Sequence, residues 1–152
     1  DQDDPVKFEN RALINAENEA YDKAVEDYTR AIDIYKEDPE TYNFRGVAYY
    51  HLGKHDLAIK DYNEAIALDP ENPVYYDNRG LSHSALQKFS LAEQDYTYSI
   101  ELYPSDPETY YQRGLARIAQ DKKGTACIDF NTARELGGNE EIEQAISEHC
   151  QQ

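Results

Sequence analysis

The chain repeats itself every 34 residues, and this period constrains its fold more than any other feature of the sequence. Several columns of the repeat hold the same kind of residue in all four copies. They are Pro5, Pro39, Pro73 and Pro107; Phe8, Tyr42, Tyr76 and Tyr110; Ala12, Gly46, Gly80 and Gly114; Ala24, Ala58, Ala92 and Ala126; and Tyr28, Tyr62, Tyr96 and Phe130. A unit of this length cannot bury an apolar face alone, so the four units between Pro5 and Gly138 are expected to stack into a continuous core.

Each unit has the pattern of two helices. An Asp or Asn followed by proline marks the start of the first helix, because the side chain accepts free N–H groups and proline already has a helical φ. First helices are expected at about 5–18, 39–52, 73–86 and 107–120, and second helices at about 22–35, 56–68, 90–102 and 124–136. The small residues of the two helices are expected to face each other, so that the backbones approach closely.

The spacing Tyr42-x2-Arg45-Gly46-x2-Tyr49, followed by Ala58-x3-Tyr62-x2-Ala65-x4-Pro70, resembles the tetratricopeptide repeat. This resemblance implies an all-α fold, a right-handed superhelical solenoid of antiparallel helix pairs. The four repeats are expected at 5–38, 39–72, 73–106 and 107–138. Residues 139–150 are expected to form a C-terminal capping helix, the ninth helix of the chain, because apolar residues recur there with helical spacing.

The charge of the chain excludes several classes of partner. The 152 residues include 31 acidic and 15 basic side chains, which give a formal net charge of −16. Nucleic acid binds through clustered Lys and Arg, which this sequence lacks, and an anionic membrane surface is excluded for the same reason. No apolar run approaches the roughly 20 residues of a transmembrane helix, so membrane insertion is not expected.

Catalysis, metal binding and cofactors are not expected either. His51 and His55 are four residues apart, but Gly53 lies in the turn between them, so they do not share a helix. No serine or cysteine has a histidine and an acid at a recognisable catalytic spacing, and no glycine-rich phosphate loop follows a strand. We therefore expect no enzyme, no metal site and no cofactor.

Two charged columns recur with the repeat, and we interpret them as structural. They are Arg11, Arg45, Arg79 and Arg113, and Asp27, Asp61, Asp95 and Asp129. Each Arg lies one turn from the tight helix contact and each Asp directly precedes the packed aromatic residue, so a ladder of bidentate salt bridges is the natural pairing. The alternative interpretation is an anion site lined by Arg.

In the family that the chain resembles, the first helices line a concave groove. The columns that would face this groove hold four carboxylates and no basic residue, with an apolar stripe beside them. The expected contact residues are Asn43, Phe44, Val47, Tyr50, Asn78, Leu81, Tyr111, Gln112, Leu115 and Ile118. Amides such as Asn78 and Gln112 can clamp the backbone of an extended peptide, or they can simply be solvated groove residues.

These features predict a non-enzymatic protein–protein interaction module that binds a basic or neutral peptide segment of a partner. The alternative is a structural or self-associating scaffold segment of a larger assembly, that is, a homo-oligomer. Family members that hold the C-terminal tails of Hsp70 and Hsp90 use a clamp of basic and amide residues. At the clamp positions of units one to three this chain has Glu9, Leu13, Phe44, Val74 and Asn78. Binding of those tails by the clamp is therefore not expected.

Cys127 and Cys150 are expected to come close, because the cap returns antiparallel to helix 124–136. They either form a disulfide that pins the end of the cap or remain reduced thiols. A disulfide would place the chain in the bacterial periplasm or at the cell surface, and reduced cysteines would place it in the cytoplasm. The sequence contains no methionine, so we expect a processed protein or a fragment, whose first residues do not indicate the compartment.

Overall fold

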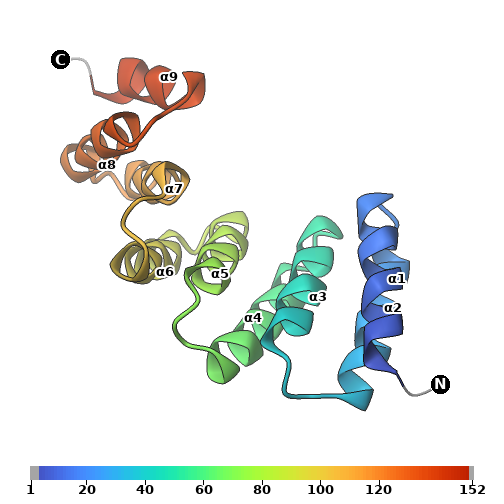
Figure 1. Ribbon diagram of the computed structural model, residues 1–152. Coiled ribbons are helices and arrows are strands. Elements are labelled where there is room, and N and C mark those ends of the chain that lie inside the picture. Colours follow the sequence, from blue (N-terminus) through green and yellow to red (C-terminus); the bar gives the residue numbers. More distant parts are fainter. Residues whose placement is uncertain (1–3, 151–152) are drawn as a thin grey trace. The chain divides into compact units, whose positions relative to one another are not determined.

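The computed structural model describes residues 4–150, and every regular element in this range is an α-helix (Figure 1). The helices are α1 (Pro5–Glu17), α2 (Tyr21–Ile34), α3 (Pro39–His51), α4 (His55–Leu68), α5 (Pro73–Ala85), α6 (Phe89–Leu102), α7 (Pro107–Ile118), α8 (Lys123–Glu135) and α9 (Glu140–His149). The predicted all-α class and the predicted helix pairs are confirmed. Within the described range, no helix is long and apolar enough to cross a bilayer.

The first helix of each pair starts at its proline because of the residue that precedes it. Asp4, Asp38, Asn72 and Asp106 have extended backbones, and each accepts a hydrogen bond from a backbone N–H in the first turn of its helix, at 3.1–3.3 Å. These bonds satisfy N–H groups that have no partner inside the helix.

The turn between the two helices of a pair contains one residue in the left-handed region. The four residues lie 34 positions apart, and they are Glu19, Gly53, Gln87 and Asp121, with φ between 58° and 69°. This conformation stops the first helix, which therefore ends one or two residues earlier than the sequence predicts. Only Gly53 adopts it without a side-chain penalty.

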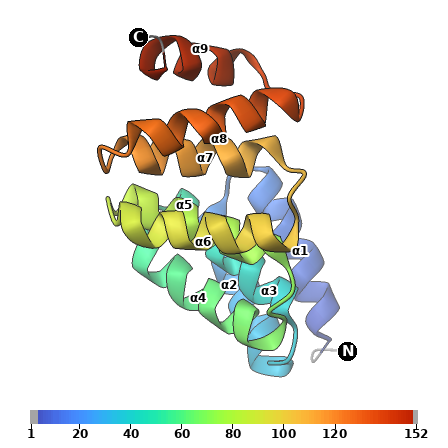
Figure 2. The ribbon, with the colours of Figure 1, turned by 90° about the vertical axis from the view of Figure 1, so that its left-hand side faces the viewer.

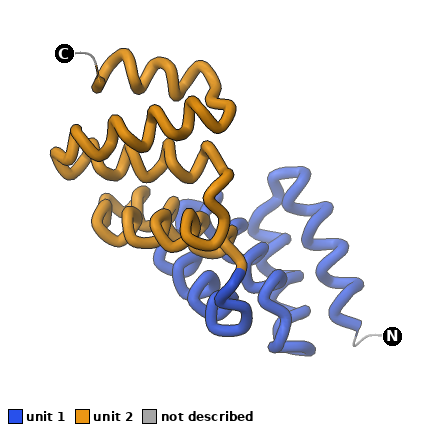
Figure 3. Tube along the Cα trace, turned by 60° about the vertical axis from the view of Figure 1, so that its left-hand side comes forward, with its two compact units in different colours: residues 1–71 blue, residues 72–152 orange. Residues whose placement is uncertain are grey.

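The chain divides into two compact units, residues 1–71 and 72–152 (Figure 3). Unit 1 contains α1–α4, and unit 2 contains α5–α9. In unit 2 the pair α5–α6, the pair α7–α8 and the single helix α9 follow one another as layers (Figure 2). Between layers, α6 packs on α7 and α8 packs on α9; in unit 1, α2 packs on α3.

An aromatic ring from the second helix forms the centre of each pair. Tyr28, Tyr62, Tyr96 and Phe130 are at most 1% exposed. A Cβ atom at Gly46 would lie 2.6 Å from the ring of Tyr62, and the glycines of α5 and α7 face their rings equally closely. The glycine lies against the ring, which fills the space that a side chain would occupy. In the first pair the small residues Ala12 and Ala24 belong to one core cluster with Tyr28, in agreement with the expected close approach of the small residues.

Candidate functional site: acidic pockets on the first helices

An ion pair joins the two helices of every pair. In each case the Arg of the first helix donates hydrogen bonds from Nε and Nη2 to the carboxylate of the Asp 16 residues later. The Nη2–Oδ1 distances are 2.5 Å for Arg11–Asp27, 2.7 Å for Arg45–Asp61, 2.6 Å for Arg79–Asp95 and 2.7 Å for Arg113–Asp129. The structure thus brings the two charged columns together within helix pairs, and the four Arg side chains are engaged there.

The aspartates of these pairs are buried, with side chains 2–7% exposed. Burial raises the pKa of Asp61 even though the hydrogen bonds from Arg45 oppose the shift. The cost of removing the carboxylate from water therefore offsets much of the attraction. Such a pair fixes how two helices meet more surely than it stabilises the fold.

Further cations of unit 2 are held by carboxylates of α6 and α8. Arg117 bridges Asp129 at 2.8 Å and Glu93 at 2.9 Å, and Lys122 Nζ lies 2.6 Å from Glu93. Burial disfavours the ionised form of Glu93, but hydrogen bonds from Lys122, Arg117 and Gln120 outweigh it and lower its pKa to about 2. These two cations are thus paired with carboxylates of α6 and α8.

A cavity of about 280 Å³ lies between α5 and α7, and we call it the α5–α7 pocket. Apolar side chains, two amides and three carboxylates surround it, and neither Lys nor Arg is among the described residues of its lining. The lining consists of Val74, Asp77, Asn78, Leu81, Tyr96, Asp106, Glu108, Thr109 and Gln112. A pocket with this composition attracts a cation and offers apolar contacts to the chain that carries it.

Asp77 is a carboxylate of the α5–α7 pocket whose hydrogen bonds are incomplete. The hydroxyl of Thr109 lies 3.1 Å from Asp77 Oδ2 and 2.8 Å from Asp106 Oδ2. A hydroxyl has one hydrogen, so it cannot donate to both carboxylates at once. Within the described chain, Asp77 Oδ1 is buried and lacks a hydrogen bond of good geometry. The carboxylate is therefore only partly satisfied by the protein.

Burial raises the pKa of Asp77 to about 6 from its ordinary value of 3.8. The nearby carboxylates of Asp106 and Asp95 add to the shift, and the hydroxyls of Ser99 and Thr109 oppose it. The protein thus holds this carboxyl group near its protonation point under mildly acidic conditions. A cation in the pocket would favour the ionised form.

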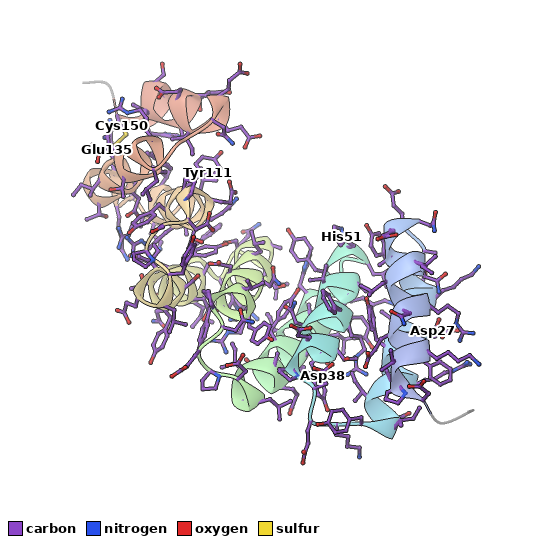
Figure 4. The ribbon with its side chains drawn as sticks, viewed as in Figure 1. Asp27, Asp38, His51, Tyr111, Glu135 and Cys150 are labelled. Atoms are coloured by element: carbon purple, nitrogen blue, oxygen red, sulfur yellow. A yellow bond between two sulfur atoms is a disulfide. The ribbon has the colours of Figure 1, made fainter. Side chains whose placement is uncertain are left out.

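A second cavity, also of about 280 Å³, lies between α7 and α9, and we call it the α7–α9 pocket. Its lining consists of Tyr111, Leu115, Glu141, Gln144, Ala145, Glu148 and His149. Burial and the carboxylates of Glu141, Glu108 and Glu148 raise the pKa of Tyr111, which shows that acidic groups gather on this side of α7. Figure 4 labels Tyr111 on α7, below α9.

The sequence-predicted contact residues of unit 2 fall into three places. Asn78, Leu81 and Gln112 line the α5–α7 pocket, and Tyr111 and Leu115 line the α7–α9 pocket. The sixth residue, Ile118 at the C-terminal end of α7, packs beside the core cluster of Ala126, Phe130 and Ala145. Tyr111 and Leu115 pack against the same cluster, so all three side chains are partly buried there.

The contact residues predicted in unit 1 differ from one another in how much of each side chain is exposed. Asn43 is only 7% exposed, which leaves little of its amide for a ligand. Phe44 is 38% exposed, and its ring centroid lies 6.1 Å from that of Tyr28. Val47 is half-buried, and Tyr50 packs edge-on against two histidine rings.

Cys127 in α8 is bonded to Cys150 at the end of α9, with the Cα atoms 5.6 Å apart (Figure 4). The bond fixes the C-terminal end of α9 on α8. Because His149 and Glu148 line the α7–α9 pocket, the same bond fixes one wall of that pocket.

Asp77, Thr109, Glu141 and Glu148 are among the pocket-lining residues that the contact set predicted from the sequence omits. A sequence signal existed for three of them. Asp77 occupies the repeat column of Tyr111, and the two glutamates are seven residues apart, which places them on one face of the cap helix.

Stacked antiparallel helix pairs, with open pockets on their first helices, define a helical repeat protein of the protein-binding scaffold class. The family model described as "Tetratricopeptide repeat" matches residues 39–72, and the model described as "TPR repeat" matches residues 13–53. No curated protein sequence matches the chain.

Several solved structures are similar to this chain. The first TPR domain of human RPAP3 is 32% identical, with 74% of this chain and 89% of that chain covered and a TM-score of 0.71. The second TPR domain of human RPAP3, in complex with the HSP70 peptide SGPTIEEVD, is 30% identical, with 76% and 100% covered and a TM-score of 0.70. MamA shares the fold at 21% identity, with 95% and 82% covered and a TM-score of 0.87. The chain belongs to the tetratricopeptide repeat family, whose members are generally non-enzymatic protein-interaction modules.

Proposed function

We propose that this chain is a non-enzymatic interaction module that binds a basic or neutral peptide segment of a partner protein on the first helices of its repeats. In unit 2 the α5–α7 pocket is the principal anchor, and the α7–α9 pocket extends the site along α7. The observation that carries this proposal is the composition of the α5–α7 pocket, which combines three carboxylates with apolar and amide side chains.

The geometry of Asp77 supports a cationic ligand. The hydroxyl of Thr109 can donate its hydrogen to Asp77 or to Asp106, but not to both at once. An Arg or Lys side chain that enters the pocket would supply the missing donor. Val74 and Leu81 would cover the aliphatic stem of that side chain, and the amides of Asn78 and Gln112 would face the peptide backbone.

The same charges argue against the ligand of a related domain. The HSP70 peptide SGPTIEEVD, bound by the second TPR domain of RPAP3, carries two glutamates and an aspartate. In the α5–α7 pocket this peptide would meet Asp77, Asp106 and Glu108. Like charges at this range repel, so the ligand of this chain differs in charge from that of RPAP3.

Fluorescence anisotropy with two labelled peptides tests the proposal. One is SGPTIEEVD, and the other is its charge-reversed form SGPTIKKVK with an amidated C-terminus. We expect the reversed peptide to bind and the acidic peptide not to bind. Added salt should weaken the binding, because it screens exposed charges.

Matched variants locate the binding. Asp77→Asn should weaken the affinity for the basic peptide about tenfold, which corresponds to about 1.4 kcal/mol for a charge-assisted contact. Glu101→Gln removes an exposed carboxylate of α6 outside both pockets and should leave the affinity unchanged. Equal losses in both variants, or preferred binding of SGPTIEEVD, would contradict the proposal.

A self-associating scaffold segment is the second candidate. Apolar side chains on the surface favour it, since Val6 and Ile14 of α1 and Ile128 of α8 are 54–65% exposed. Light scattering over a range of concentrations separates the two candidates, because a peptide-binding module without self-association keeps the mass of one chain. In either case the disulfide supports a compartment outside the reducing cytosol.

A further inference from the structure

The residues that line the α5–α7 pocket occur a second time in unit 1, 68 residues earlier in the sequence. Of the nine lining residues, seven are identical. Val74, Asn78, Leu81, Tyr96, Asp106, Glu108 and Thr109 correspond to Val6, Asn10, Leu13, Tyr28, Asp38, Glu40 and Thr41. A shift of one repeat, 34 residues, toward the N-terminus retains only Tyr96, which corresponds to Tyr62, and the same shift toward the C-terminus retains only Leu81, which corresponds to Leu115. The fold alone does not explain the match, because a requirement of the fold would recur in every repeat.

The two sets of residues also share their hydrogen bonds. In unit 1 the hydroxyl of Thr41 lies 3.1 Å from Glu9 Oε1 and also contacts Asp38 Oδ2. The hydroxyl of Thr109 makes the same pair of contacts with Asp77 and Asp106. In both units one hydroxyl hydrogen is therefore shared between a carboxylate of the preceding first helix and the carboxylate that caps the next one.

Two of the nine positions differ, and the differences change the ligand contacts. Glu9 replaces Asp77, which keeps the charge on a side chain one methylene longer. Phe44 replaces Gln112, and its exposed ring lies beside Tyr28. An exposed aromatic face near carboxylates is a favourable surface for a cation.

The surface of unit 1 is open at these residues. Val6 is 54% exposed and Leu13 is 38% exposed, so apolar contacts are available around the carboxylates. Neither Lys nor Arg stands at any of the nine corresponding positions. The charge of this surface therefore complements the same kind of peptide as the α5–α7 pocket does.

We infer that unit 1 carries a second peptide-binding site, formed by Val6, Glu9, Leu13, Glu40 and Phe44, which takes the Lys or Arg side chain of a second basic segment. This inference rests on the proposed function of unit 2. The chain then has two binding sites: it binds two copies of a short basic peptide, and a partner with two basic segments contacts both units. Such a partner gains affinity from the second contact through a raised effective concentration.

Isothermal titration calorimetry of the full chain with the amidated peptide SGPTIKKVK tests the inference. We expect two peptides per chain. Glu9→Gln should weaken the unit 1 site about tenfold and leave the unit 2 site unchanged, and Asp77→Asn should weaken the unit 2 site about tenfold and leave the unit 1 site unchanged. Glu17→Gln, which removes an exposed carboxylate at the end of α1, is the matched control and should retain both sites.

The aromatic ring of Phe44 provides a second test of the unit 1 site. In the Asp77→Asn background the unit 1 site is the tighter of the two, and Phe44→Gln should weaken it about two- to fivefold through the loss of a cation–π contact. Circular dichroism confirms that each variant is folded. A single site that Asp77→Asn weakens and Glu9→Gln leaves unchanged would overturn this inference while the proposed function stands. An absence of binding to the unmodified chain would overturn the proposed function itself.

Discussion

Replacement of Asp77 by asparagine tests the electrostatics of the α5–α7 pocket independently of any ligand. Burial raises the pKa of this residue to about 6, so folding favours the neutral carboxyl group relative to the unfolded chain, although the ionised form still predominates above pH 6. A group whose pKa is raised by folding contributes its full stability below its ordinary pKa of 3.8, and this contribution is lost as the pH rises through about 6. Asp77→Asn keeps the shape, removes the charge and should stabilise the chain at neutral pH.

The size of the effect follows from the pKa. One pKa unit corresponds to 1.36 kcal/mol, so full ionisation of a fully shielded Asp77 would lower the free energy of unfolding by about 3 kcal/mol. Water reaches the open pocket and screens part of this charge, which reduces the expected gain of the variant to about 2 kcal/mol at pH 8. At pH 4 the variant and the unmodified chain should differ little.

Urea unfolding followed by circular dichroism between pH 4 and pH 8 measures this difference. Glu101→Gln, at an exposed position of α6, should show no comparable rise with pH. A variant that is less stable than the unmodified chain at pH 8, or a difference that does not change with pH, would refute the reasoning. A carboxylate retained at a cost in stability is expected of a residue that serves binding.

Three further predictions concern the fold. Asp61→Ala should destabilise the chain by about 3 kcal/mol in urea unfolding because it leaves the guanidinium of Arg45, whose side chain is only 16% exposed, without the carboxylate that balances its charge. A loss of a few tenths of a kcal/mol would show that water replaces the contact. Reduction of the Cys127–Cys150 bond should lower the free energy of unfolding by about 3 kcal/mol, and a chain with serine at both positions should not respond to the reductant. Gln87→Gly should raise thermal stability by about 1 kcal/mol, since it relieves a left-handed residue; an unchanged melting temperature would contradict this.

The fold was largely predictable because its signals are local. The Asp-Pro or Asn-Pro pairs place the starts of α1, α3, α5 and α7 at the residues where the structure has them. The helix ends were predicted less well, because the left-handed positions in two of the turns are occupied by Glu19 and Gln87 and not by glycine, the residue that usually marks such a turn in a sequence. The repeat columns predicted that small residues lie at the helix contact, but they did not show that the ring of Tyr62 lies against Gly46.

The site was predictable only in part, because a repeat column does not state how deeply a residue is buried. Asn78, Leu81 and Gln112 could be assigned to a binding surface from their column. The buried position of Asn43 and the packing of Ile118 against the cluster of Ala126, Phe130 and Ala145 depend on how the helices meet, which the columns do not encode.

The central claim, that a basic peptide binds on the first helices of unit 2, is tested most directly by nuclear magnetic resonance. The amide signals of the nitrogen-15-labelled chain are followed during titration with the amidated peptide SGPTIKKVK. We predict that the signals of Asn78, Leu81 and Gln112 shift in proportion to the bound fraction. Shifts confined to exposed residues of the second helices, such as Tyr98 and Ile128, with the pocket signals unchanged, would contradict the claim.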